Sequence, residues 1–291
     1  MIRRLAIIGV GLIGGSLALS LRRNAAVEEV VGCGRSAANL ERARALGVID
    51  HGCHDPAEAV QGADLVVICV PLRAMRGVLA ALEGAVEPGT VVTDAGSVKG
   101  SVIEDARAVF GTPPAWLVPG HPIAGTENSG VEAAFAELYD GRRVILTPTA
   151  ENPEDAVERV SALWQAAGAQ VVCMEADHHD EVLAATSHLP HALAYALVDA
   201  LASWDDRQEI FEYAAGGFRD FTRIASSDPA MWRDICTANR AHLVAALRRY
   251  QEDLGRLTEA LAAGDDDQVL RVFENAQEAR AGFLRLLEGR S

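Results

Sequence analysis

The pattern of apolar and polar positions divides the chain into a part with alternating strands and helices and a part with helices alone. Continuous apolar runs, typical of parallel strands buried on both faces, occupy residues 5–8 and 64–70. Strands that alternate with helices predict a mostly parallel, doubly wound sheet with right-handed crossovers. Further strands are expected at 28–33, 90–94 and 116–118, with helices between them at 37–46, 73–82 and 101–110.

The strand pattern ends near residue 177, after a strand at 143–147, a helix at 154–167 and a strand at 170–173. We therefore expect an N-terminal α/β domain over 1–174 and an all-α domain over 175–291. Pro190 predicts that the first helix of the second domain kinks or breaks near Ser187, because proline has no backbone N–H to donate. The helices of this domain are predicted at 180–202, 209–224, 229–261 and 266–288.

Three glycines follow the first apolar run with the spacing Gly9-x-Gly11-x-x-Gly14, and a helix-forming segment comes next. Gly9 permits a sharp turn, Gly11 lets the backbone approach a pyrophosphate, and Gly14 lets the helix pack close to the strand. The helix N-terminus offers N–H groups and a partial positive charge to phosphates. This order predicts a Rossmann-type dinucleotide-binding site rather than a glycine-rich turn of another α/β protein.

In a parallel sheet, ligands bind at the carboxyl ends of the strands. The expected cofactor site therefore extends from the glycine turn to the end of the apolar run at 64–70. Besides the three glycines, the residues expected there are Leu12, Ile13, Val70 and Pro71.

The residues after the strand at 28–33 bear on the choice of cofactor. Enzymes that use NAD usually place an acidic residue there to bind the ribose hydroxyls. This chain has Gly34, Arg35 and Ser36 instead. Arg35 and Ser36 favour NADP because they can hold a 2′-phosphate, whereas an Arg35 that only stacks on adenine is compatible with NAD.

Charge and cysteine content limit the partners. With 291 residues and a formal charge of −15, the chain is not expected to bind nucleic acid or an anionic membrane. An anionic substrate must therefore meet a local basic cluster. The five cysteines include no pair that is close in sequence, which favours buried thiols in a reducing cytoplasm over a disulfide framework. Lys99, the only lysine among 26 basic residues, is a weak pointer to a special role.

Two loops past predicted strand ends carry candidate catalytic side chains. Ser97 and Lys99 lie between a strand and a helix, where Ser97 or Ser101 is alternatively a helix N-cap. His121 lies between a glycine and a proline, which predicts a non-helical turn that faces the cleft. Histidine is the usual general base near neutral pH, and a histidine held only by loop hydrogen bonds is the alternative.

Two arginines of the helical part suit an anionic substrate. Arg219 and Arg223 are four residues apart, so on one helix they share a face. Two guanidinium groups on one face match a substrate with two carboxylates, and a solvated pair balanced by Asp220 is the alternative. The histidines of this part have no spacing that matches a recognised ligand set, so no metal site is expected.

Together these motifs resemble the prephenate/arogenate dehydrogenase family of tyrosine biosynthesis, in the family's order and over nearly the whole chain. The resemblance implies an enzyme that oxidatively decarboxylates prephenate to 4-hydroxyphenylpyruvate and CO₂, or arogenate to tyrosine, with hydride transfer to NAD or NADP. The sequence does not separate the two substrates. The matching residues lie at 9–16, 94–100, 121–127, 186–191, 218–223 and 227–232.

The resemblance assigns roles residue by residue. His121 matches the catalytic histidine that takes the proton of the ring hydroxyl as hydride leaves C4. Ser97 matches the serine that positions this hydroxyl and His121. Arg223 matches the arginine that binds a substrate carboxylate, and Glu127 matches a glutamate that gates the site.

Other implications concern the helical domain. Arg219 falls where relatives carry a basic residue near the substrate side chain. His188 and His191 match histidines that are mainly structural at the domain junction, and His188 is also a candidate for substrate binding. The resemblance further implies a homodimer formed through the helical domain and a monofunctional enzyme without a regulatory or mutase domain.

Two alternatives stay open. A β-hydroxyacid dehydrogenase has a similar plan, but it uses a lysine of the second domain, whereas Lys99 lies in the first. A non-catalytic dinucleotide sensor does not need His121, Ser97 and Arg223 to converge.

Overall fold

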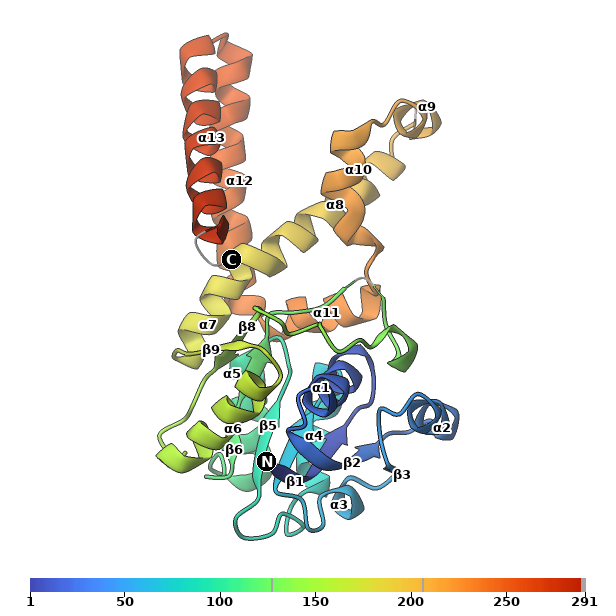
Figure 1. The fold of residues 1–291 in the computed structure, drawn as a ribbon. Coiled ribbons are helices and arrows are strands. Elements are labelled where there is room, and N and C mark those ends of the chain that lie inside the picture. The colour runs from blue at the N-terminus through green and yellow to red at the C-terminus, as the bar shows by residue number, and fades with distance from the viewer. Residues whose placement is uncertain (127, 206, 289–291) are drawn as a thin grey trace. The chain divides into compact units, whose positions relative to one another are not determined.

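The structure, a computed structural model, describes residues 1–126, 128–205 and 207–288. Glu127, the predicted gate, therefore lies outside the described residues. The chain forms two compact units, Met1–Arg240 and Ala241–Ser291. Figure 1 shows the strands in the first unit and a pair of long helices in the second. Within the described part of the chain, no helix is long and apolar enough to cross a lipid bilayer.

A parallel sheet of six strands is the centre of the first unit. Every pair of neighbouring strands in it is parallel, and the spatial order is β3-β2-β1-β4-β5-β6. This order reverses direction between β1 and β4, which is where doubly wound sheets bind ligands. The predicted α/β fold with a parallel sheet is confirmed. The strands are β1 (Ile2–Ile8), β2 (Val27–Cys33), β3 (His51–Cys53), β4 (Leu65–Ile68), β5 (Val91–Asp94) and β6 (Leu117–Val118).

Both faces of this sheet are buried. Leu5 and Ile7 of β1 belong to one apolar cluster, and the alternate residues Ala6 and Ile8 belong to another on the opposite face. This two-sided burial explains why the central strands are continuous apolar runs in the sequence. The connecting helices are α1 (Leu12–Arg23), α2 (Ala37–Ala45), α3 (Pro56–Ala59), α4 (Leu72–Ala81) and α5 (Lys99–Phe110).

A second, three-stranded sheet was only partly predicted. Its strands are β7 (Gly120–Pro122), β8 (Arg143–Leu146) and β9 (Gln170–Cys173), and α6 (Glu154–Ala166) connects the last two. Strand β7 pairs antiparallel with β8, and His121 lies opposite Ile145. The prediction that His121 lies in a turn was therefore wrong. Pairing with β8 overrides the local preference of Gly-His-Pro for a turn.

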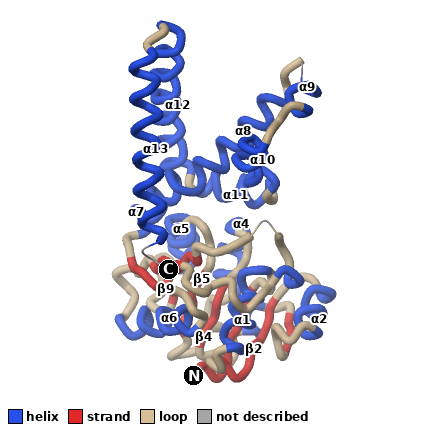
Figure 2. The backbone as a smooth tube through the Cα atoms, turned by 45° about the horizontal axis from the view of Figure 1, so that its top comes forward, coloured by secondary structure: helices blue, strands red, loops and turns tan. Residues whose placement is uncertain are grey.

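After Cys173 the described chain is helical, as Figure 2 shows in blue. The expected break before Pro190 takes the form of a π-helical turn at Ala184–His188, which separates α7 (Ala176–Leu183) from α8 (Leu189–Ala202). Proline fits the first turn of α8 because its missing N–H would have no partner there. The next elements are α9 (Arg207–Glu212), α10 (Gly216–Thr222), a 3₁₀ turn at Arg223–Ser226 and α11 (Pro229–Ala238).

The single helix predicted over 229–261 is in fact two helices. Helix α11 ends at Ala238, and Asn239 leaves the helical conformation with φ −97° and ψ +36°. The side chain of Asn239 is buried and donates to the carbonyl oxygen of Asp180 at 2.7 Å. This long-range contact, which no local pattern shows, explains the break. The second unit is a helical hairpin of α12 (Arg240–Ala263) and α13 (Asp266–Glu288), which lie side by side.

Candidate active site

The glycine turn after β1 contains the close approaches that its spacing predicts. Gly9 has a φ of +101°, and a Cβ there would lie 2.3 Å from the carbonyl oxygen of Cys69. A Cβ on Gly14 would lie 2.6 Å from Cγ2 of Ile7 and would push α1 away from β1. A Cβ on Gly11 would meet no atom within 4 Å, so the space beside Gly11 has room for a ligand.

The start of α1 provides donors for an anionic group. Gly11 is the N-cap of α1 and supplies no side-chain cap, so the first N–H groups of the helix are available to phosphate oxygens. Leu12 is buried and Ile13 is partly buried beside them. Strand β4 runs parallel to β1 as its neighbour. Val70 and Pro71 follow β4, so they lie at the same edge of the sheet as the glycine turn. This backbone fits the pyrophosphate of a dinucleotide.

Arg35 and Ser36, which follow β2, are the two residues that bear on the choice of cofactor. Arg35 is exposed, so its guanidinium is accessible to a ligand. The hydroxyl of Ser36 accepts a hydrogen bond from the backbone N–H of Asn39 at 3.2 Å and caps α2. A capping hydroxyl retains its own hydrogen for donation to a phosphate oxygen.

A buried ion pair joins the end of β5 to the start of β7. The ammonium group of Lys99 bonds to the carboxylate of Asp94 and donates to the carbonyl oxygen of Gly120 at 2.6 Å. The same carboxylate accepts from the backbone N–H of Gly96 at 2.7 Å and of Gly120 at 3.1 Å. Burial lowers the pKa of Lys99, and Asp94 opposes this shift. The pair thus fixes the backbone next to Ser97 and next to His121.

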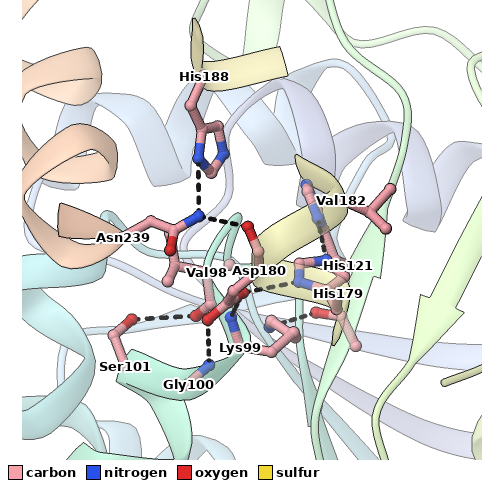
Figure 3. Close-up of polar contacts among 12 residues, drawn as sticks. Val98, Lys99, Gly100, Ser101, His121, His179, Asp180, Val182, His188 and Asn239 are labelled. Carbon is pink, nitrogen blue, oxygen red and sulfur yellow. Dashed lines mark hydrogen bonds and ion pairs between the residues drawn. The ribbon is translucent and has the colours of Figure 1, made fainter. Parts of the chain in front are cut away.

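A chain of three side chains leads away from His121, as the dashed lines in Figure 3 show. Nδ1 of His121 lies 2.9 Å from Nε2 of His179, and Nδ1 of His179 lies 2.7 Å from Oδ1 of Asp180. All three residues are buried. Burial, followed by the charges of His179, Lys99 and His188, holds the pKa of His121 well below its ordinary value of 6.5.

Asp180 also caps α5. Its two carboxylate oxygens accept the backbone N–H groups of Lys99 and Gly100, each at 2.8 Å. Burial raises the pKa of Asp180, but the hydrogen bonds from His179, Lys99 and Gly100 outweigh it and lower the pKa overall. The alternative that Ser97 or Ser101 caps this helix was wrong: Val98 is the N-cap, without a side-chain cap. Ser97 is half-buried beside it.

Two further predicted histidines, His188 and His191, lie at the end of the π-helical turn and in the first turn of α8. Nδ1 of buried His188 lies 3.1 Å from the amide nitrogen of Asn239, so the proton of neutral His188 is on Nε2. The ring of His191 stacks on Trp232, with centroids 3.5 Å apart and planes 16° apart. Burial lowers the pKa of His191 despite a hydrogen bond to Ser187, and the nearby Arg223 lowers it further.

The structure brings some predicted site residues together and leaves others apart. His121 and His188 are near enough for the charge of His188 to act on His121, and Arg223 is near His191. Arg219 is exposed and pairs with Asp220 at 3.6 Å. Arg219 and Arg223 do not share one regular helix, because α10 ends at Thr222.

Sequence reasoning missed Asp94 and the functional connection of His179 to Asp180. His179 and Asp180 are adjacent in the sequence, and nothing in this local pattern connects them to His121 or Lys99. Their partners are 58 and 81 residues away, at His121 and Lys99. The one sequence feature that could have indicated this connection is a carboxylate immediately after a histidine, near the expected start of the helical domain.

Comparisons with known proteins give consistent results. Residues 17–173 match the family described as prephenate dehydrogenase, nucleotide-binding domain, and residues 175–275 match prephenate dehydrogenase, dimerization domain. The cyclohexadienyl dehydrogenase of Zymomonas mobilis is 42% identical over 280 residues, which cover 96% of this chain and 95% of that protein. The prephenate dehydrogenase of Bacillus subtilis is 34% identical over 278 residues, or 94% of this chain and 74% of that protein.

Solved structures show the same similarity. The prephenate dehydrogenase from Aquifex aeolicus in complex with hydroxyphenyl propionate and NAD⁺ has a TM-score of 0.91 and 36% identity, covering 97% of this chain and 99% of that chain. The Synechocystis arogenate dehydrogenase has a TM-score of 0.82 and 26% identity, covering 96% of this chain and 99% of that chain.

Proposed function

This chain belongs to the prephenate dehydrogenase family, and from that premise we propose that His121 is the general base of an oxidative decarboxylation at the carboxyl edge of the parallel sheet. The protein is a nicotinamide-dependent dehydrogenase of tyrosine biosynthesis that acts on prephenate, arogenate or both. The observation that carries the proposal is the common edge at which β1 delivers the glycine turn and β6 leads into His121.

The reaction needs one base and accurate positioning. His121 takes the proton of the ring hydroxyl as hydride leaves C4, and the electrons of the bond to CO₂ complete the aromatic ring. The phenol oxygen then takes the proton back, so His121 returns to its neutral form. The bound nicotinamide dinucleotide supplies the acceptor of the hydride. Since the pKa of His121 is well below 6.5, its ring is neutral and able to accept a proton at neutral pH.

The substrate contacts follow the family assignment. Ser97, half-buried next to the Asp94–Lys99 pair, orients the ring hydroxyl toward His121. Arg223 binds a substrate carboxylate, and its proximity to His191 supports this role. Arg219, which is exposed, attracts the dicarboxylate into a protein of charge −15.

His188 completes the predicted set of substrate contacts. The amide of Asn239 directs the proton of neutral His188 to Nε2, and the role of His188 as a substrate contact rests on the family resemblance. Glu127 stays a candidate gate on the resemblance alone.

Of the two nicotinamide dinucleotides, we propose that NADP is the preferred cofactor. Exposed Arg35 and the hydroxyl of Ser36 stand where an acidic residue would otherwise bind the ribose of NAD. A guanidinium group there pairs with a 2′-phosphate, whereas NAD offers it only hydroxyl groups. NADP is therefore the preferred cofactor, and NAD is the alternative.

We also propose which domain performs each function. Residues 1–174 hold the cofactor and the base, and 175–291 bind the substrate carboxylates and form a homodimer. The match of 175–275 to a dimerization domain supports the second part. The enzyme acts on a small molecule, and its free cysteines support a reducing compartment such as the cytoplasm.

A two-by-two assay tests this function. The purified protein is given prephenate or arogenate with NAD or NADP, and reduced cofactor is followed by absorbance. The expected result is turnover in at least one combination, with a higher kcat/KM for NADP than for NAD. Absence of turnover in all four combinations, with turnover of a 3-hydroxy acid instead, would replace the proposal by the β-hydroxyacid alternative.

A further inference from the structure

The ring nitrogen of His121 that faces away from His179 is the one that must accept the substrate proton. Neutral imidazole holds its hydrogen on one nitrogen only, so a base at this position works in only one of its two tautomers. We propose that His179 and Asp180 are positioning residues that place the hydrogen of His121 on Nδ1 and leave the lone pair on Nε2. This inference rests on the proposed function of His121 as the base.

Asp180 is held in place by the start of α5. One oxygen of its carboxylate accepts the backbone N–H of Gly100, and the other accepts the backbone N–H of Lys99 and contacts Nδ1 of His179. A carboxylate with three such contacts is ionised and offers only acceptors. The hydrogen of the His179–Asp180 bond therefore belongs to Nδ1 of His179.

The tautomer of His179 then determines that of His121. With its hydrogen on Nδ1, neutral His179 has a lone pair on Nε2, and this atom lies 2.9 Å from Nδ1 of His121. A bond between these two nitrogens requires that His121 donate. The hydrogen of His121 is therefore on Nδ1, and Nε2 is its basic nitrogen.

The opposite arrangement makes the site inactive. A protonated His179 would donate to Nδ1 of His121, so the hydrogen of His121 would be on Nε2 and the ring could not accept a proton there. In the proposed arrangement, the proton taken from the substrate stays on Nε2 of His121. The Nδ1–H bond to His179 persists, and the negative Asp180 stabilises the imidazolium through the intervening ring.

Capping of α5 does not by itself account for this geometry. A cap needs only the contacts of Asp180 with Lys99 and Gly100, and α5 would keep them without His179. His179 is completely buried, and both of its ring nitrogens contact polar side chains. Its neighbour His178 lies on the same helix with its side chain 61% exposed and pairs only loosely with Glu181, at 3.6 Å.

The variant His179→Phe removes both ring nitrogens and keeps a ring of similar size. We expect kcat to fall by about 10²–10⁴-fold, the range for an impaired or misoriented base. The KM for the substrate and for the cofactor should change by less than about threefold, because neither binding site loses a contact. His178→Phe is the matched control on the same helix and should keep the wild-type kcat.

The decisive readout is the tautomer itself, measured by ¹⁵N NMR of histidine-labelled wild-type protein at neutral pH, with the signals of His121 assigned by their loss in His121→Asn. The inference predicts hydrogen on Nδ1 and an unprotonated Nε2, and a mixture of both tautomers in His179→Phe. Hydrogen on Nε2 in the wild type would overturn it, even where His179→Phe fails to fold.

The two proposals can fail separately. If His121→Asn keeps its turnover, the base assignment fails and the inference fails with it. If His121→Asn loses turnover while a folded His179→Phe keeps the wild-type kcat, only the positioning role is wrong.

Discussion

At the scale of single residues, the site depends on ionisable groups that are buried in fixed pairs. His121 is surrounded by His179, Lys99 and His188, and burial makes its protonation still less favourable. The same low-dielectric surroundings strengthen the Asp94–Lys99 pair. His121 must be neutral when the substrate binds, and its buried surroundings favour that form.

The pH profile of kcat/KM reflects this arrangement. His121 must be neutral to accept the substrate proton, and its pKa lies well below 6.5. As the pH falls, activity should be retained through pH 6.5 and lost only below it, where His121 becomes protonated. An acidic limb centred at or above pH 6.5, measured with saturating cofactor, would contradict this order of pKa values.

Loss of Lys99 should reduce stability strongly. Lys99→Met leaves the buried carboxylate of Asp94 without its partner, and removal of one member of a buried pair typically costs about 3–5 kcal/mol. Arg76→Met is the control, because Arg76 is mostly exposed in its pair with Asp105 and should lose less than about 1 kcal/mol. Urea unfolding measures both. Equal losses would show that Lys99 is not a structural clamp.

Residues whose neighbours are local were predictable, and residues whose partners are distant in sequence were not. His121 stood out because glycine and proline flank it after a predicted strand. Asp180 did not, because two of its three contacts come from Lys99 and Gly100, about 80 positions away in the sequence, and only the contact with His179 is local. The single lysine was only a weak signal, and burial beside Asp94 now explains why a larger guanidinium group would not replace it there.

At the scale of elements, the sequence predicts those strands and helices that have a clear hydrophobic pattern. The central strands β1 and β4 are visible because both their faces are buried. Strand β7 escaped prediction because its three residues form no pattern, and only pairing with β8 defines it. The end of α11 escaped prediction because Asn239 bonds to a residue 59 positions away.

The glycine turn allows cofactor binding and stability to be separated by two substitutions. Gly11→Ala places a Cβ in open space, at a φ of −117° that alanine tolerates, so stability should fall by less than about 1 kcal/mol. The same Cβ occupies space next to the bound pyrophosphate, so the KM for the cofactor should rise at least about tenfold.

Gly9→Ala should behave differently. It meets the carbonyl oxygen of Cys69 at a φ of +101°, and it should lower the free energy of unfolding by about 1–3 kcal/mol or more. Thermal unfolding and cofactor titrations of both variants test the turn. A Gly11→Ala protein with unchanged cofactor KM would exclude a pyrophosphate from this position.

At the scale of the whole molecule, the helical hairpin has apolar stripes on its surface. Tyr250, Leu254 and Leu261 share one face of α12 by helical spacing, and Leu270 and Phe273 share one face of α13. All five side chains are exposed in a single chain. Exposed apolar side chains on one helix face are typical of an interface, which agrees with the match to a dimerization domain.

A charge on such a stripe should dissociate the dimer. Phe273→Glu places a carboxylate on the apolar face of α13, and Asn275→Glu adds the same charge nearly opposite, on a side that is already polar. Sedimentation velocity should give twice the chain mass for the wild type and for Asn275→Glu. Phe273→Glu should sediment as a monomer at the same concentration, and an unchanged dimer would place the interface elsewhere.

The proposed reaction depends on His121 as the base at the edge of the sheet. Its most direct test is the steady-state turnover of prephenate by His121→Asn, with cofactor affinity measured in parallel by fluorescence. We expect a kcat lower by about 10²–10⁴-fold with cofactor affinity unchanged, because only the base is lost. Turnover within a few-fold of the wild type in a variant that binds cofactor normally would contradict it.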